Sequence, residues 1–570
     1  MAEKKIKWTD QQQRAIEARG SDILVTASAG TGKTAVLSGR CVEIASDKSL
    51  CQDVRSILVL TFTEAAAEEM RSRITTQLRD IFLQNPDNHI RRQLMLLQGA
   101  DISTIHSFCK RLITEYFYKL GLDPTFSVID GDEQKLLKTE ALEKTIDWAW
   151  QQSNLQAALE QLLYRRDLRP NDGFLTKIIY ISDFLDGVVS RRDWYEKAAH
   201  LADAVNPFTT DIGEKQKQIV ADKLRDTLAR IQYAVKLYEN DNPGGKWAMK
   251  WNETFVEPVT AYIKLIKCGS WDKFSKEIRN YQKPSRYEYK PRGLSGPVAD
   301  IIKSVAEEAK KSFEELCDLA ILNPNYLDSL SGSVGLQTKV LIELVKKFAQ
   351  LYSQAKRTLN CLDFADLEHY ALKLLTAEDS SQDQIKPSET AIMLREKYKY
   401  IFVDEYQDIN SVQQCLLEKL SPGGNVLEVG DVKQSIYAFR GAQPDIFLEQ
   451  LKHASGEIEK AQGGLRVDLN LNFRSAKGIL DFVNKIFSRI MTDSFAKIDY
   501  DESHKLKPGN EDESQGGTIS QSKPVVEFHM LDEIEKGNGS DNEMNNEPNG
   551  DEKFSLITNR QSQAAMIARR

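Results

Sequence analysis

The stretch that most restricts how this chain can fold is "ASAGTGKT", residues 27–34. An apolar run, Ile23-Leu24-Val25, comes just before it, and the next segment, "KTAVLSGRCVEIA", carries apolar residues at helical spacing. A buried strand, a glycine-containing loop and a helix in this order are the context of a phosphate-binding loop. The sequence therefore predicts an α/β fold with a parallel sheet and a P-loop nucleotide site, although an accidental match to the pattern is the alternative.

The loop departs from the usual G-x-x-x-x-G-K-[ST] pattern at one position, where Ala27 replaces the first glycine. The close approach of phosphate depends mainly on Gly30 and Gly32, so the replacement is tolerable. Lys33 is expected to reach the β- and γ-phosphates, and Thr34 to hold Mg²⁺. The predicted nucleotide-binding residues of the loop are Ala27, Ser28, Ala29, Gly30, Thr31, Gly32, Lys33 and Thr34.

A second segment, "KYIFVDEYQD", supplies the acids that a phosphate loop needs. Residues 400–403 form an apolar run typical of a strand, and Asp404 would hold the metal at its carboxyl end. Glu405 would activate the attacking water. Alone, two acids after a strand also suit a helix N-terminus. Together with the loop they indicate an ATP hydrolase that uses Mg²⁺, and the long gap between Lys33 and Asp404 predicts an inserted domain.

The composition limits the class of protein. The formal net charge of −8 argues against non-specific coating of nucleic acid but allows a local basic groove. The seven cysteines are scattered and form no C-x-x-C, which predicts neither a metal cluster nor a disulfide framework. The charged N-terminus leads into no apolar signal region, and no apolar run is long enough to span a membrane. We expect a cytoplasmic, nucleoid-associated protein.

Eight segments in order carry a family resemblance: "WTDQQQRAI", "ASAGTGKT", "LTFTEAAAEEMRSRI", "STIHSFCKRL", "LDFADLEHYALKLL", "FVDEYQD", "VGDVKQSIYAFRGAQPDIF" and "LNLNFRS", within residues 8–475. They resemble the superfamily 1 UvrD/Rep-type DNA helicases. Their wording is most similar to AddA, the helicase–nuclease subunit of AddAB, and stand-alone helicases of the family remain an alternative. The resemblance implies a motor of two RecA-like lobes with ATP between them. It implies 3′→5′ movement on single-stranded DNA, unwinding of duplex ends in double-strand break repair, an AddB-type partner, and an exonuclease in a C-terminal domain.

The resemblance also implies roles for further residues of the nucleotide site. Gln12 matches the glutamine that reads adenine, and Phe473 matches an aromatic residue, usually Tyr, that stacks on the base. Gln434 matches a sensor of the γ-phosphate, and Arg474 matches an arginine finger, with a surface ion pair as its alternative. Where many relatives carry an arginine as a second wall for the base, this chain has Ala35.

On the DNA side, the resemblance implies base stacking on exposed aromatic rings and contacts to phosphate or sugar. The alternative for any one aromatic residue is core packing, and for His106 it is a structural histidine. The residues implied are Thr61, Phe62, Thr63, Ser103, His106, Tyr437 and Phe439.

The predicted organisation divides a first lobe, 1A, into two parts, 1–110 and 361–475, around a helical insertion, 1B, at 111–360. The remainder, 476–570, would begin lobe 2A and contain a flexible acidic insertion at 505–552. Within 1B, Leu136, Leu137, Leu142 and Ile146 are expected to share one helical face.

Two further features bear on the insertion and on the end of the chain. The segment "KEIRNYQKPSRYEYKPR", 276–292, suits either a DNA contact or an ordinary solvated loop. The later motifs and a nuclease cluster are not recognisable, so we expect an N-terminal fragment of a longer protein.

Two other functions compete with the helicase interpretation. The chain could be a DNA- or partner-binding module that hydrolyses nothing. It could also be a nucleotide switch unrelated to DNA, which "TFTEAAAEEM" and "STIHSFC" disfavour because they have no evident role in a switch.

Overall fold

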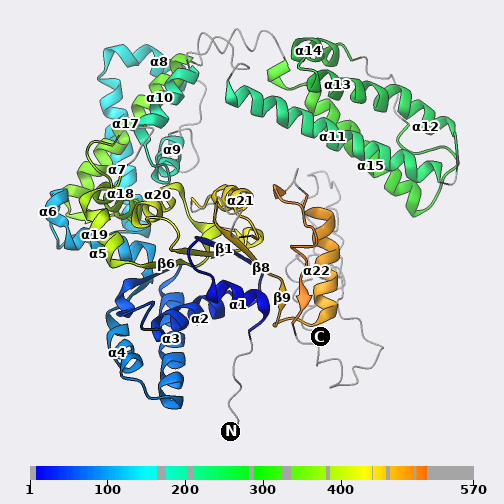
Figure 1. Ribbon diagram of the computed structural model, residues 1–570. Coiled ribbons are helices and arrows are strands. Elements are labelled where there is room, and N and C mark those ends of the chain that lie inside the picture. The colour runs from blue at the N-terminus through cyan, green and yellow to red at the C-terminus, as the bar shows by residue number, and fades with distance from the viewer. Residues whose placement is uncertain are drawn as a thin grey trace, which may run out of the picture. The chain divides into compact units, whose positions relative to one another are not determined.

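The structure, a computed structural model (Figure 1), describes residues 8–163, 175–202, 210–240, 242–281, 288–322, 335–380, 386–438, 441–457, 463–492 and 496–509. The chain divides into two compact units, Met1–Leu469 and Asn470–Arg570, and each is described by itself. Phe439 and the predicted acidic insertion from residue 510 onward lie outside the described residues. No described helix is long and apolar enough to cross a membrane.

The first unit is built on a six-stranded sheet with the strand order β3-β2-β6-β7-β1-β8. Every neighbouring pair of these strands is parallel, which confirms the predicted α/β fold with a parallel sheet. The strand that precedes the P-loop has partners on both sides, with Val25 opposite Val429 and Val467. The strands are β1 (Ile23–Ala27), β2 (Ile57–Thr61), β3 (Asp101–Thr104), β6 (Tyr400–Val403), β7 (Val426–Gly430) and β8 (Leu465–Leu469).

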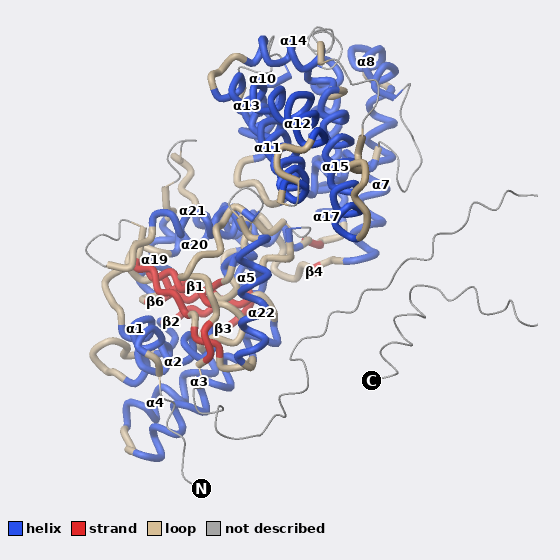
Figure 2. Tube along the Cα trace, turned by 90° about the vertical axis from the view of Figure 1, so that its right-hand side faces the viewer, coloured by secondary structure: helices blue, strands red, loops and turns tan. Residues whose placement is uncertain are grey.

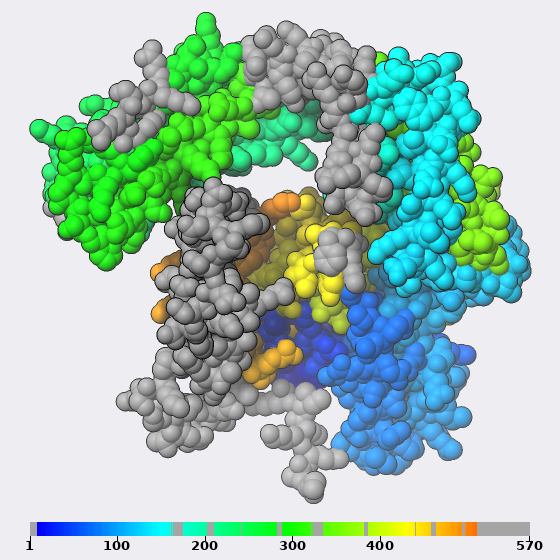
Figure 3. Space-filling view, turned by 180° about the vertical axis from the view of Figure 1, so that it is seen from behind, coloured from blue at the N-terminus to red at the C-terminus, as the bar shows by residue number. Residues whose placement is uncertain are grey.

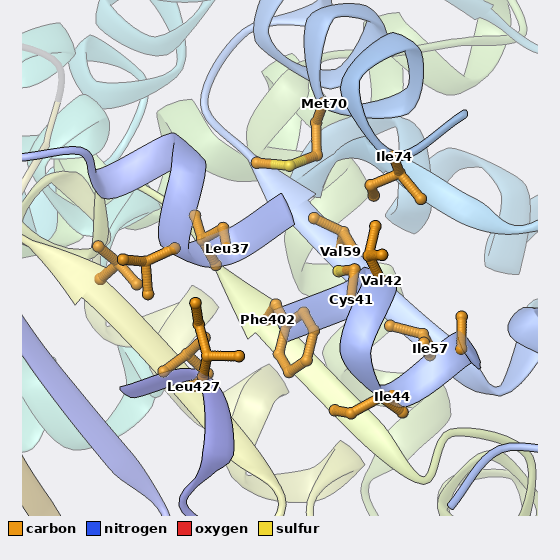
Figure 4. Close-up of a cluster of buried hydrophobic side chains, with 14 of the residues drawn as sticks. Leu37, Cys41, Val42, Ile44, Ile57, Val59, Met70, Ile74, Phe402 and Leu427 are labelled. Atoms are coloured by element: carbon orange, nitrogen blue, oxygen red, sulfur yellow. The ribbon is translucent and has the colours of Figure 1, made fainter. Parts of the chain in front are cut away.

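The strands read as nearly continuous apolar runs because helices cover both faces of the sheet (Figure 2). Ile23 and Val25 point into one apolar core, shown in Figure 4, and Leu24 points into the other. The first face is covered by α1 (Asp10–Glu17), α2 (Lys33–Ser46), α3 (Glu64–Gln84) and α4 (Asn88–Leu96). The second is covered by α5 (Ile105–Glu115), α18 (Phe364–Leu375), α19 (Glu389–Lys397), α20 (Ser411–Leu420) and α21 (Pro444–His453).

Sequence segments from the two ends of this unit therefore share one domain. In Figure 3 the blue N-terminal segments and the yellow segments after residue 400 meet at the surface. Between them, α6 (Phe117–Leu120) and a short parallel pair, β4 (Ser127–Val128) with β5 (Cys361–Leu362), flank the ends of the inserted helices.

The segment between β4 and β5 is helical in the described residues and contains two separate apolar cores. One belongs to α7 (Gly131–Trp150), α8 (Ser153–Leu163), α9 (Thr176–Asp186), α10 (Arg191–Ala202) and α17 (Gly335–Thr358). The other belongs to α11 (Asp211–Glu239), α12 (Lys246–Trp251), a π-helical turn (Asn252–Val256), α13 (Glu257–Lys267), α14 (Trp271–Arg279) and α15 (Pro297–Cys317).

One prediction about α7 is wrong in part. Leu136 is 62% exposed, whereas Leu137, Leu142 and Ile146 are half-buried against the core. The fully buried positions of α7 are small or polar: Ala141, Thr145 and Ala149. Small side chains let α17 pack closely along this line, so the contact face is rotated away from Leu136.

The basic and aromatic segment 276–292 is only partly described. Tyr281 packs against Phe313, with ring centroids 5.0 Å apart, and its hydroxyl donates to the carbonyl of Thr254 at 2.8 Å. Tyr289 is likewise half-buried against this core. These two rings support the helices, which favours the structural interpretation for them.

The second unit contains α22 (Lys477–Ile490) and a parallel pair, β9 (Leu471–Asn472) with β10 (Lys507–Pro508). Asn484 joins them, because its amide donates to the carbonyl of Leu506 at 2.9 Å and accepts from the hydroxyl of Tyr500 at 2.8 Å.

Candidate nucleotide and DNA site

The predicted site segments of the first unit gather at the carboxyl edge of the sheet. The P-loop follows β1, Phe62 follows β2, His106 follows β3, Glu405 follows β6 and Gln434 follows β7. Because these strands are parallel, their carboxyl ends lie at one edge, which is where open α/β sheets bind ligands.

The P-loop has a backbone that requires its glycines. Gly30 and Gly32 both have positive φ, +76° and +90°. A Cβ on Gly32 would also lie 2.9 Å from the Nε2 of Gln12. Inside the loop, the hydroxyl of Thr31 donates to the carbonyl of Ser28 at 2.7 Å. Gly32 provides no side-chain cap for α2, so the N–H groups of the first helical turn have the arrangement that binds anions.

Gln12 supports this loop from α1. Its Nε2 donates to the carbonyl of Thr31 at 3.1 Å, and its Oε1 accepts from the N–H of Thr9 at 3.1 Å. The side chain is buried. A primary amide has two N–H groups and two lone pairs, so one donor and one acceptor remain for an adenine edge. Adenine recognition by Gln12 stays a prediction.

Lys33 and Glu405 form an ion pair, with Nζ and Oε2 3.0 Å apart. The same Oε2 accepts a hydrogen bond from Nε2 of Gln407 at 2.7 Å. Glu405 has a left-handed backbone conformation, φ +51°, which is uncommon for a residue other than glycine. This conformation turns the chain sharply after β6 and brings the carboxylate to the P-loop lysine.

Asp404 is buried beside this pair, and its Oδ1 accepts from the N–H of Glu405 at 3.0 Å. Burial, together with the negative charge of Glu405, raises the pKa of Asp404 to about 6, although the charge of Lys33 acts in the opposite direction. A buried carboxylate whose charge is poorly compensated suits a hard cation that prefers oxygen ligands. Asp404 and the hydroxyl of Thr34 therefore fit a bound Mg²⁺.

A hydrogen-bonded chain links the acids after β6 to the residues after β7. The Oε1 of buried Gln407 accepts from the N–H of Asp431 at 2.9 Å, and Nε2 of Gln434 donates to Asp431 at 2.7 Å. Gly430 permits this contact, because a Cβ there would lie 2.6 Å from Oε1 of Gln407. Glu405 and Gln434, which sequence analysis treated separately, thus belong to one polar network.

The residues after β2 and β7 form an aromatic pair. The rings of Phe62 and Tyr437 have centroids 4.8 Å apart at 33°, and Phe62 is 36% exposed. The neighbouring hydroxyls serve the local fold: Thr61 donates to the carbonyl of Thr63 at 3.0 Å, and the Thr63 hydroxyl caps α3 by accepting from the N–H of Ala66 at 3.1 Å. Phe62 therefore has the exposure that base stacking requires.

His106 lies in the first turn of α5, with its Nε2 2.9 Å from Oε1 of Glu368. Its ring meets that of Phe364 edge to face, with centroids 4.9 Å apart. The hydroxyl of Ser103 is buried and has no hydrogen-bond partner in the described part of the chain, so a DNA contact there would require it to become accessible.

The comparison with protein families decides what this arrangement belongs to. The family model of the UvrD/REP helicase N-terminal domain matches residues 8–455. The chain belongs to this family. The match includes the P-loop, both acids after β6, Gln434 and the segments that carry Phe62 and His106.

Curated relatives of this UvrD/REP chain include proteins named as the AddA-type subunit of an ATP-dependent helicase/nuclease. The one from Anoxybacillus flavithermus is 35% identical over 515 residues, which are 89% of this chain and 42% of the relative. The one from Acetivibrio thermocellus is 31% identical over 604 residues, 99% of this chain and 46% of the relative. The chain thus spans less than half the length of these relatives.

Two predicted site residues of the UvrD/REP chain, Phe473 and Arg474, belong to the second unit. Asn472 shapes their backbone, because its Oδ1 accepts from the N–H of Arg474 at 2.9 Å and from that of Ser475 at 2.7 Å. Their roles toward ATP stay predictions.

Sequence analysis missed Gln407 and Glu368. The glutamine stands two positions after Glu405, and this proximity was the available signal. Glu368 lies in "LDFADLE", a segment quoted for the resemblance, but nothing in the sequence indicates its contact with His106.

Proposed function

We propose that this chain carries the ATP-hydrolysing part of a DNA helicase that moves along single-stranded DNA. The observation that carries the proposal is the shared sheet edge, where the P-loop, the acids after β6, Gln434, Phe62 and His106 follow parallel strands. Nucleotide chemistry and strand contact at one edge suit a protein in which hydrolysis drives movement.

In the proposed reaction, water attacks the γ-phosphate of ATP. Lys33 meets the β- and γ-phosphate oxygens and neutralises their charge, which requires it to leave Glu405. Glu405, released from the lysine, accepts the proton of the attacking water. Thr34 and Asp404 would hold Mg²⁺, which supplies charge neutralisation at the phosphates. Gln434 senses the γ-phosphate, and the roles implied for Phe473 and Arg474 remain part of the proposal.

The finer activity follows the names of the relatives, which include a helicase and a nuclease. We propose 3′→5′ translocation, unwinding of duplex DNA ends at double-strand breaks, a partner of the AddB type, and a cytoplasmic, nucleoid-associated location. Any nuclease activity belongs to the whole protein of this type.

The test is ATP hydrolysis by the purified chain, with and without oligothymidine, and with Lys33→Ala as the inactive control. Hydrolysis that rises with single strands and disappears in Lys33→Ala supports the proposal. Strand binding with no hydrolysis would favour the binding module, and hydrolysis indifferent to DNA would favour a nucleotide switch.

A further inference from the structure

Glu368 is a buried acid whose partners come from both sides of the candidate site. Its side chain, on α18, is 4% exposed. Oε1 lies 2.9 Å from Nε2 of His106 and accepts from Nε2 of Gln413 at 2.6 Å, and Oε2 accepts from Nδ2 of Asn410 at 2.9 Å. Burial alone would raise the pKa of Glu368, but these three hydrogen bonds hold it below its usual value. Glu368 is therefore an ionised group inside the core.

A buried carboxylate is costly unless donors satisfy it, so the geometry of these partners is constrained. Asn410 uses both ends of its amide. Its Oδ1 accepts from the N–H of Gln413 at 2.8 Å and caps α20, while its Nδ2 binds Glu368. A shift of the carboxylate would therefore disturb the start of α20.

The start of α20 is close in sequence to the catalytic acids. Only a 3₁₀ turn, Tyr406–Asp408, and Ile409 separate Glu405 from Asn410. Tyr406 is buried, and Asp408 accepts from the hydroxyl of Ser435 at 3.2 Å. A displacement at Asn410 thus reaches Glu405 through a short, packed segment rather than through a free loop.

On the other side, His106 is 36% exposed at the side chain and lies at the end of the strand next to Phe62's strand. Glu368 and the ring of Phe364, both on α18, fix the imidazole. A strand that contacts this ring must either accept the position set by Glu368 or pull on the carboxylate.

We propose that Glu368 is a positioning residue that couples single-strand binding at His106 to the nucleotide site through the start of α20. The inference rests on the proposed function, because it needs both ligands to bind. It assigns the chain a link between its two binding events, and that link can fail while each event still occurs.

The experiment measures the affinity of the chain for fluorescein-labelled oligothymidine, with and without a non-hydrolysable ATP analogue and Mg²⁺. The ratio of the two dissociation constants is the coupling, and we expect at least about fivefold in the wild type. Glu368→Gln replaces one acceptor oxygen by an N–H donor among three donors, so the ratio should fall to about one. Glu418→Gln, on the exposed side of α20, is the matched control and should keep the wild-type ratio.

A second variant guards against misfolding of Glu368→Gln. Asn410→Ser keeps an oxygen that caps α20 and loses the hydrogen bond to Glu368, so it should also lower the ratio. Thermal denaturation separates lost stability from lost coupling, because a purely structural acid would lower Tm and leave the ratio unchanged.

Three outcomes overturn the inference. A wild-type ratio of one would show that the two ligands are not coupled, although ATP and DNA binding would still stand. A wild-type ratio in both folded variants would show that the coupling bypasses Glu368. Absence of ATP and DNA binding in the wild type would remove the proposed function as well.

Discussion

The P-loop lysine, Lys33, and the acid proposed as the general base, Glu405, lie 3.0 Å apart as an ion pair. Each is the strongest local partner that the other can have while no phosphate is bound. ATP must therefore exchange this pair for new contacts, and the exchange frees the base at the moment when its substrate arrives.

Lys33→Ala should abolish ATP hydrolysis and lower the affinity for a fluorescent ATP analogue by at least about tenfold, because the ammonium contacts phosphate. The fold should persist, since an ion pair of this kind contributes roughly 0–1 kcal/mol. Equilibrium titration and circular dichroism measure both. Lys48→Ala, an exposed lysine after α2, is the control and should behave as wild type. Hydrolysis at the wild-type rate in Lys33→Ala would sink the assignment.

Glu405→Gln should slow hydrolysis by roughly 10²-fold or more, because the amide cannot accept the proton of water. Affinity for ATP should stay the same or increase, since a negative charge beside the phosphates is removed. Single-turnover hydrolysis and analogue titration separate the two effects. Equal loss of binding and hydrolysis would mean that Glu405 is a ligand or a structural residue.

Asp404→Asn should stabilise the chain without ligand at pH 7.5 and have little effect at pH 4. The pKa of Asp404 is raised in the folded state to about 6 from the ordinary 3.8, so its favourable contribution exists at low pH and is lost as pH rises through 6. The gain at pH 7.5 is at most about 3 kcal/mol. Thermal denaturation measures it.

Mg²⁺ provides the matching test for this carboxylate. Adding Mg²⁺ with an ATP analogue at pH 7.5 should raise Tm more in the wild type than in Asp404→Asn, because the metal needs the ionised acid. An equal rise in both proteins would exclude Asp404 as a metal ligand.

Gln407→Ala should lower the free energy of unfolding by about 1–3 kcal/mol, because the N–H of Asp431 loses its buried acceptor. It should also reduce hydrolysis more than ATP affinity, since Glu405 loses the hydrogen bond that orients it. Denaturant unfolding and steady-state hydrolysis give the two numbers. Reduced stability with unchanged hydrolysis would restrict Gln407 to a structural role.

Phe62→Ala should weaken binding of oligothymidine by about 5- to 150-fold, which corresponds to the roughly 1–3 kcal/mol of one base–aromatic stack. The dependence of affinity on salt should not change, because phosphate contacts are retained. Tyr118→Ala, which removes a ring that is 63% exposed on α6, is the control. Fluorescence anisotropy at several salt concentrations measures both variants, and equal weakening in both would contradict a specific stack.

Sequence was most informative where local pattern determines structure. The strand, loop and helix around Gly30, and the strand before Asp404, follow from apolar runs and glycine chemistry, and the parallel sheet follows from them. The side on which α7 packs did not follow from the leucines, because the small residues Ala141 and Ala149 determine the close approach.

The connections between distant segments could not be predicted. The left-handed backbone of Glu405 is held by its tertiary contacts with Lys33 and Gln407, not by a local preference. The pairing of Glu368 with His106 joins helices that are far apart in sequence, and a single sequence contains no signal for such a pair.

The place of β1 in the sheet has a consequence for how the protein is made. Both of its neighbours, β7 and β8, come from the far end of the first unit, and a hydrogen bond between Thr26 and Asp468 joins residues 442 positions apart. At typical translation rates, the ribosome needs on the order of 20–90 s to make the chain between them. During that time the strand that leads into the P-loop has neither of its edges paired, and it can associate with other exposed strands. A nascent chain of this kind therefore depends on chaperone protection of its first eighty or so residues, and a ribosome that stalls before residue 426 would release a P-loop that has no sheet to hold it.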